Sequence, residues 1–237
     1  MKTKYAVALM VLALALISNA LAQDTAAQAS ASTDPAELGK RSATVHQTCV
    51  DQLKRYSWNI DSMLSKDGEA KIHVVANCRL NEKGELVQEV EKAETSVRHK
   101  RGLRGRAQSQ KLNELSILLD HIVDQMVTYT YMSTDEESAF FKKATITEGS
   151  GDDAGKLIVK ATDVSTKGDK VTKWIDATSL YPTRITFEAV VDEVPVDGEV
   201  LYRPIEGGPN VPRMATINIP SEKGVIEAEF LDYAKQL

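Results

Sequence analysis

The sequence predicts an α+β fold in which a large curved antiparallel sheet, an incomplete barrel, is covered by two main helices. Two segments carry apolar residues at spacings of three and four, which is typical of amphipathic helices. About ten other segments alternate apolar and polar residues, which is typical of strands with one buried face. The links between these segments are short and contain the glycine, proline and aspartate residues that hairpin turns favour.

The composition is that of an ordinary globular protein, with 237 residues of which 42% are hydrophobic and 27% are charged. A formal net charge of −5 argues against nucleic acid as a partner, because nucleic-acid-binding domains are generally basic. The two cysteines exclude a disulfide-rich scaffold and a four-cysteine zinc site. We find neither a repeat nor a domain boundary, and we expect residues 34–237 to form a single domain.

An export signal precedes this domain. Two lysines are followed by an apolar run from Tyr5 to Ile17, and Ala20-Leu21-Ala22 has the small residues that signal peptidase recognises. We therefore expect a cleavable signal peptide over 1–22, a flexible polar leader over 23–33 and a periplasmic or secreted protein. Because no other apolar run approaches the length of a bilayer span, the protein is not expected to span the membrane after cleavage.

The first predicted helix begins after Asp34, which can cap it, with Pro35 in its first turn. We expect it to end before Trp58. Gly39 weakens it. One helix face carries a largely apolar stripe made of Leu38, Ser42, Val45, Cys49 and Leu53.

A three-stranded meander is expected next. Residues 71–80 alternate as a strand between turn signals at 66–68 and 81–84. The flanking segments 58–64 and 85–93 are then its neighbours.

The mid-chain helix has the strongest helical pattern. Its stripe consists of Leu112, Leu115, Leu119, Ile122 and Met126. Ser133 and Glu136 then resemble a capping box for a short helix that carries Phe140 and Phe141. The acids Glu136 and Glu137 suit the positive end of a helix dipole, which explains them without acid–base catalysis.

Everything after Ala144 is predicted to be strand and turn. The expected strands are 144–148, 156–162, 170–176, 183–191, 199–204, 213–219 and 225–232. Turn signals separate them at 149–151, 167–169, 181–182, 197–198, 207–209 and 223–224. A sheet of about ten strands must curl or close to limit its exposed edges.

One segment resembles a known family. The string KWIDATSLYPTRITFEA, residues 173–189, resembles the pattern W-x-D-x-x-T-x-x-P-x-R-x-x-F of LolA/LolB-like proteins. The strings RYSWNIDSMLSKDGEAK, HKRGLRGR and FLDYAK resemble a family of uncharacterised exported bacterial proteins. The resemblance implies a LolA-like fold, an incomplete barrel with a helical cover around a cavity for acyl chains. The basic stretch 98–106 and the residues that open and close sorting factors have no match.

The resemblance implies an exported, non-enzymatic protein that binds or carries an apolar ligand, which could be a lipid, an acyl chain or a lipoprotein. The alternative is an envelope scaffold with a filled core, which acts through contacts with another envelope protein. The candidates for cavity-lining residues are Trp58, Ile72, Val74, Trp174, Ile185 and Phe187. The same side chains could equally fill a dry core, because periodicity does not separate the two.

The run 98–106 is the most distinctive charge feature. Its residues Arg101, Arg104 and Arg106 are candidates for contact with an anionic lipid headgroup or an acidic partner. The alternative is a solvated loop whose arginines pair with surface acids.

Cys49 and Cys78 lie on the apolar faces of the first helix and of strand 71–80. A disulfide between them is one expectation in an oxidising compartment. Two separate buried thiols are the other.

Catalytic and metal-binding motifs are missing from the sequence. His46, His73, His99 and His121 have no metal-ligand spacing, and His121 is expected on a solvated helix shoulder. The glycine-rich segment 149–155 lacks the spacing of a calcium loop and is expected to be a hairpin tip. No nucleophile–base arrangement is recognisable, so a hydrolase is disfavoured, and neither a cofactor nor a metal is expected.

Overall fold

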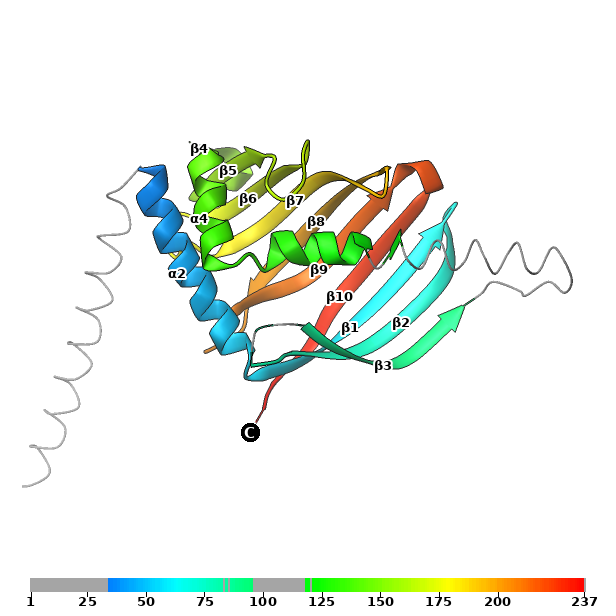
Figure 1. Cartoon of the computed structure of the whole chain (residues 1–237). Helices are drawn as coiled ribbons and strands as arrows, with labels where there is room; N and C mark the ends of the chain where they lie inside the picture. The colour runs from blue at the N-terminus through cyan, green and yellow to red at the C-terminus, as the bar shows by residue number, and fades with distance from the viewer. Residues whose placement is uncertain (1–33, 83, 85, 96–117, 120, 237) are drawn as a thin grey trace, which may run out of the picture.

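The computed structural model describes residues 34–236, apart from 83, 85, 96–117 and 120. The fold is one sheet of ten strands in the order β3-β2-β1-β10-β9-β8-β7-β6-β5-β4, with helices on one side of it (Figure 1). The helices are α2 (Pro35–Leu53), a helical segment at 118–119 and 121–130, and α4 (Thr134–Lys143). The strands are β1 (Tyr56–Lys66), β2 (Glu69–Leu80), β3 (Leu86–Thr95), β4 (Thr145–Glu148), β5 (Lys156–Thr162), β6 (Lys170–Asp176), β7 (Pro182–Val191), β8 (Val194–Pro204), β9 (Asn210–Ile219) and β10 (Gly224–Lys235).

The sheet joins the two ends of the domain. Neighbouring strands are antiparallel throughout, and β1 pairs with β10, so that Tyr56 lies opposite Lys235. The N-terminal meander thereby extends the C-terminal run of strands into one surface. The sheet is not closed, because β3 and β4 are its two edges. This arrangement confirms the predicted α+β class and the open, curved antiparallel sheet.

Helix α2 begins and packs as its sequence requires. The carboxylate of Asp34 accepts a hydrogen bond from the backbone N–H of Ala36 at 3.1 Å, and Pro35 occupies the first turn. Gly39 has a packing role. A Cβ atom at this position would lie 2.7 Å from the Cβ of Phe141 on α4, so the glycine permits close contact between the two helices.

The predicted capping box of α4 is confirmed. The Ser133 side chain accepts a hydrogen bond from the Glu136 backbone, and the Glu136 carboxylate accepts one from the Ser133 backbone at 2.7 Å. The helix buries Phe140 and Phe141 against the sheet.

One predicted turn is wrong. Asp197 and Gly198 lie inside β8, and the hairpin turn before β8 is made instead by Asp192 and Glu193, both with positive φ. Gly198 faces inward directly opposite Phe187. A Cβ on Gly198 would lie 2.4 Å from the Phe187 ring, so this glycine gives the ring its space.

The inner face of the sheet carries two cores. The packed end lies beneath α2 and α4 on β5 to β9, and its large buried side chains include Tyr129, Phe140, Phe141, Ile185 and Phe187. The hollow end lies on β1, β2, β8, β9 and β10, and includes Trp58, Ala76, Val200, Ala215, Ala228 and Phe230. Within the described part of the chain, no helix is both long and apolar enough to span a membrane.

Candidate functional site

A pocket of about 150 Å³ lies at the hollow end, between the inner face of the sheet and the helical segment 121–130. Alternation along β1 turns Trp58, Ile60 and Ser62 toward it. Strands β9 and β10 contribute Ala215, Ile217, Ile226, Ala228 and Phe230, and the helix contributes Val123, Met126, Val127 and Thr130. The pocket therefore has an almost wholly apolar wall, the kind of surface that binds hydrocarbon groups.

The six predicted cavity residues separate into four groups, of which Trp174 forms the last. Trp58 and Val74 line the pocket. Ile72 is half-buried on β2, and it does not belong to the wall. Ile185 and Phe187 are buried at the packed end, where the Phe187 ring contacts Tyr129 with centroids 5.3 Å apart. The expectation that these two line the cavity is wrong, because α4 and the helical segment fill the space above them.

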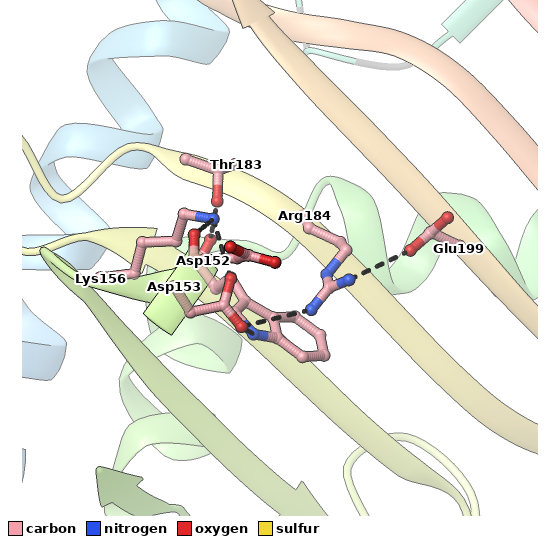
Figure 2. Close-up of polar contacts among 7 residues, drawn as sticks. Asp152, Asp153, Lys156, Thr183, Arg184 and Glu199 are labelled. Atoms are coloured by element: carbon pink, nitrogen blue, oxygen red, sulfur yellow. Dashed lines mark hydrogen bonds and ion pairs between the residues drawn. The ribbon is translucent and has the colours of Figure 1, made fainter. Parts of the chain in front are cut away.

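Trp174 lies on the opposite side of the sheet, and its predicted place in the cavity is also wrong. Val171, Lys173 and Ile175 are the inward-facing residues of β6, so Trp174 faces outward by alternation. Its indole stacks under the guanidinium of Arg184 at 3.6 Å and donates to the Asp153 carboxylate at 3.0 Å. Figure 2 shows this group of contacts, in which Arg184 also reaches Glu199 at 3.7 Å.

The rest of the segment that carries the family resemblance also has structural roles. The Asp176 carboxylate accepts hydrogen bonds from the backbone N–H of Thr178 and Ser179, at 3.1 and 2.7 Å, and shapes the turn between β6 and β7. The Thr183 hydroxyl donates to the Trp174 carbonyl at 3.1 Å. These residues therefore build a turn and an outer-face stack, and they do not touch the pocket.

The packed end contains a buried ion pair that the sequence analysis did not find. Glu137 of α4 pairs with Lys173 of β6, and both side chains are only 4% exposed. The Ser42 hydroxyl of α2 donates to the same carboxylate at 3.0 Å. The ammonium also lies 5.0 Å from the centre of the Phe140 ring. The pair thus ties both helices to the sheet.

The charge of Glu137 follows from these partners. Burial alone would raise its pKa, but Lys173, His46 and the hydrogen bonds outweigh burial and leave the pKa below its usual value. The pKa of His46 on α2 is lowered too, but here burial is the main cause, and Glu137 opposes this effect. At neutral pH the carboxylate is therefore ionised and the imidazole is neutral.

The two cysteines are not bonded to each other, so the disulfide expectation is wrong and the alternative of two buried thiols holds. Burial raises the pKa of both thiols, that of Cys78 to about 11. Cys49 lies near Tyr181 and the Asn210 backbone, whereas the Cys78 sulfur lies 3.9 Å from the Ala76 carbonyl. Neither thiol has the lowered pKa of a reactive cysteine.

The structure does not describe the predicted headgroup or partner contacts. Arg101, Arg104 and Arg106, like His99, lie outside the described residues. His121 is exposed as expected, and its Nδ1 lies 2.5 Å from the Asp192 carboxylate. Among the residues with a described position, no group of three or more histidines, cysteines and acids could hold a metal ion.

Sequence reasoning found two strand residues of the pocket but missed the wall formed by β9, β10 and the helix. The alternation in 213–219 and 225–232 places Ile217 and Phe230 on inward faces, but it does not reveal which inward faces meet. The alternation in 170–176 places Lys173 on the same face as the apolar residues Val171 and Ile175. This pattern could have predicted that the Lys173 charge is buried.

Comparisons with known proteins give likeness at the level of fold. No family model matches the chain, and a search of curated proteins finds no match. A DUF1329 family protein from Desulfovibrio piger has 10% identity and a TM-score of 0.44, over 86% of this chain and 95% of that chain. A LolA superfamily protein from Nitrosomonas europaea has 11% identity and a TM-score of 0.39, over 82% and 92% of the two chains.

A third solved structure, an outer membrane lipoprotein-sorting protein domain from Vibrio parahaemolyticus, has 10% identity and a TM-score of 0.43, over 85% of this chain and 93% of that chain.

Proposed function

We propose that this chain is a non-enzymatic protein of the cell envelope that binds an apolar ligand in the pocket at the hollow end. The candidate ligands are a lipid, an acyl chain and the acyl part of a lipoprotein. The observation that carries the proposal is the pocket itself, about 150 Å³ in volume, and none of the described residues in its wall carries a charged side chain. Hydrophobic burial supplies the affinity in such a pocket.

The volume limits what the pocket holds in this conformation. An engineered apolar cavity of about 150 Å³ admits one benzene molecule. The pocket at the hollow end therefore accommodates a short apolar group, such as a few carbons of one chain. A second chain or a headgroup would lie outside it.

The envelope location of the proposal is supported by the predicted signal peptide over 1–22, which lies outside the described residues.

A matched pair of variants tests the proposal. Ala215 lines the pocket, whereas Ala189 lies at the packed end, and both are buried. Native mass spectrometry and organic extraction of protein purified from the envelope should recover a defined lipid from the wild type and from Ala189→Leu. The Ala215→Leu variant should carry much less, because leucine occupies part of the pocket.

Retention of the same lipid by a folded Ala215→Leu variant would contradict this location of the site. A wild-type protein that is always free of lipid, and that also fails to bind a neutral fluorescent hydrocarbon probe such as N-phenyl-1-naphthylamine, would favour a scaffold with a filled core.

A further inference from the structure

Strand β3 is an edge of the sheet, and it contributes Leu86 and Gln88 to the pocket wall (Figure 1). Of the wall residues that the structure describes, Gln88 alone is exposed, and the others are buried or half-buried. Val90, two residues further along β3, is 58% exposed although it is apolar. The pocket therefore opens to the surface beside Gln88 and Val90.

The Gln88 side chain points toward the inner face of the sheet. Gln88 lies directly opposite Cys78 of β2, and Val90 lies opposite Ala76. Opposed residues of an antiparallel pair place their side chains on the same face of the sheet. Cys78 and Ala76 both belong to the core on the inner face, and Ala76 lines the pocket. Gln88 is thus a polar side chain at the mouth of the pocket.

The Gln88 amide differs from two polar groups deeper in the wall. The Ser62 hydroxyl donates to the Val74 carbonyl at 3.2 Å, and the Thr130 hydroxyl donates to the Met126 carbonyl at 2.8 Å. Both hydroxyl hydrogens are therefore used within the protein. The exposed Gln88 amide presents N–H donors and a carbonyl acceptor to solvent, and a ligand at the mouth can take the place of that solvent.

The size of the pocket determines which part of a ligand reaches Gln88. A volume of about 150 Å³ holds only a few carbons of one chain. The polar end of a bound acyl chain therefore lies at the mouth. Its carbonyl oxygen is a hydrogen-bond acceptor, which matches the N–H donors of the Gln88 amide.

We propose that the Gln88 side-chain amide donates a hydrogen bond to the acyl carbonyl oxygen of a ligand whose chain lies in the pocket. This inference rests on the proposed function and adds an orientation to it. The end of the chain lies beside Ala215, and the carbonyl lies beside β3. Because both partners exchange hydrogen bonds with water, the net gain is modest. Gln88 therefore sets specificity, while hydrophobic burial supplies the affinity.

Competition with a neutral fluorescent hydrocarbon probe tests the inference on the full protein. The competitors are methyl octanoate, octanoate and nonane, since an acyl carbonyl can belong to an ester or to a free fatty acid. Gln88→Met keeps an unbranched side chain of similar length and removes the amide. It should weaken at least one of the two carbonyl ligands about three- to tenfold and leave nonane within about twofold. The ligand that loses more affinity identifies the source of the carbonyl.

Gln52→Met is the matched control, because Gln52 is an exposed glutamine of α2 and does not belong to the pocket wall. It should leave all three affinities unchanged. A second measurement needs no substitution. In nuclear magnetic resonance spectra of the wild-type protein, the side-chain NH₂ resonances of Gln88 should move more with the preferred carbonyl ligand than with nonane.

The outcomes separate the two proposals. If the competitors bind but Gln88→Met weakens all of them equally or none of them, the role of Gln88 is overturned while apolar binding stands. Equal responses of the Gln88 NH₂ resonances to the carbonyl ligands and to nonane would overturn it as well. If neither the probe nor any competitor binds folded wild-type protein, the proposed function itself fails.

Discussion

The packed end and the hollow end share one sheet and one pattern of alternation, yet only one of them is filled. At the packed end, large rings enter from α4 and β7, and glycines make room for them: Gly39 for Phe141 and Gly198 for Phe187. At the hollow end, three alanines stand on the inner face beneath the helical segment: Ala76, Ala215 and Ala228. The packed end also buries two alanines, Ala161 and Ala189, so small inward residues alone do not make a cavity. The difference is that rings from α4, the helical segment and β7 fill the packed end.

The two ends also differ in charge. The packed end buries Glu137 and Lys173 as a pair that connects α4 with the sheet, and Ser42 adds a contact from α2. At the hollow end, the pocket-wall residues that the structure describes include none that is charged at neutral pH. Stability at the packed end is therefore expected to depend on pH, and the hollow end is expected to respond to apolar ligands.

The largest expected effect comes from breaking the buried pair. Lys173→Met leaves Glu137 without its cationic partner in a site where both are 4% exposed. We expect a loss of about 3–5 kcal/mol in unfolding free energy, measured by urea denaturation. The matched control is Lys170→Met, which removes an exposed pair with Glu188 and should cost less than about 1 kcal/mol.

The double variant Lys173→Met, Glu137→Met completes this test. Since it leaves no unpaired charge, it should recover much of the lost stability. A double variant as unstable as Lys173→Met alone would show that the charge pair is not what the single substitution disturbs.

The second prediction compares one substitution at both ends. Phe187→Ala empties a filled space and should cost about 3–5 kcal/mol of unfolding free energy. Phe230 already borders the pocket and lacks contacts on that side, so Phe230→Ala should cost at least about 1 kcal/mol less. Equal costs, measured by thermal or urea unfolding without ligand, would mean that the hollow end is as well packed as the other.

The third prediction concerns pH. His46 has a lowered pKa in the folded protein, so the unfolded chain binds more protons once the pH falls below the ordinary histidine pKa near 6.5. The contribution of His46 to stability is therefore present above that pH and is lost as the pH decreases. Urea unfolding between about pH 7.5 and pH 5 should show this decline, and His46→Gln should flatten it.

Titration of Glu137 should cause a second decrease in the free energy of unfolding, at lower pH than that of His46. Its folded pKa is lowered, so its contribution is present above the unfolded carboxyl pKa of about 4.3 and is lost as the pH falls through the folded value. Binding of a neutral hydrocarbon at the hollow end should stay constant down to the pH at which the protein begins to unfold.

The smallest expected effect is on the outer face. Arg184 stacks on Trp174 and lies 3.7 Å from each of two carboxylates, but its side chain is 34% exposed. Arg184→Ala should therefore cost only about 0.5–1 kcal/mol in unfolding free energy. Probe binding should be unchanged, because this stack lies across the sheet from the pocket. Loss of binding in a stable Arg184→Ala protein would connect the outer face to ligand uptake.

Much of the fold was predictable from local patterns. Strands 156–162 and 170–176 were placed within the bounds that the structure has, and the caps at Asp34 and Ser133 were identified. These features depend on neighbours in sequence, which alternation and capping chemistry report. The mistaken turn at Gly198 had a tertiary cause, because the glycine makes room for Phe187 on the neighbouring strand.

The candidate site was predictable only in part. Of the predicted cavity residues, Trp58 and Val74 lie in the pocket wall, whereas Ile185 and Phe187 face inward at the packed end. Trp174 was predicted to line the cavity, but it faces outward, because the buried residues of its strand are Val171, Lys173 and Ile175. The position of a cavity depends on how far each helix reaches across the sheet, and the sequence does not encode that reach in any single segment.

The most direct test of the account is a crystal structure of the protein soaked with a methyl ester of a bromine-labelled octanoic acid. Anomalous scattering locates the bromine without assumptions about the fit of the chain. We expect the bromine between the helical segment 121–130 and the inner face of β9 and β10, beside Met126 and Ala215. Bromine bound beneath α4 beside Phe187, or a pocket that stays empty in crystals saturated with the ester, would contradict the assignment of ligand binding to the hollow end.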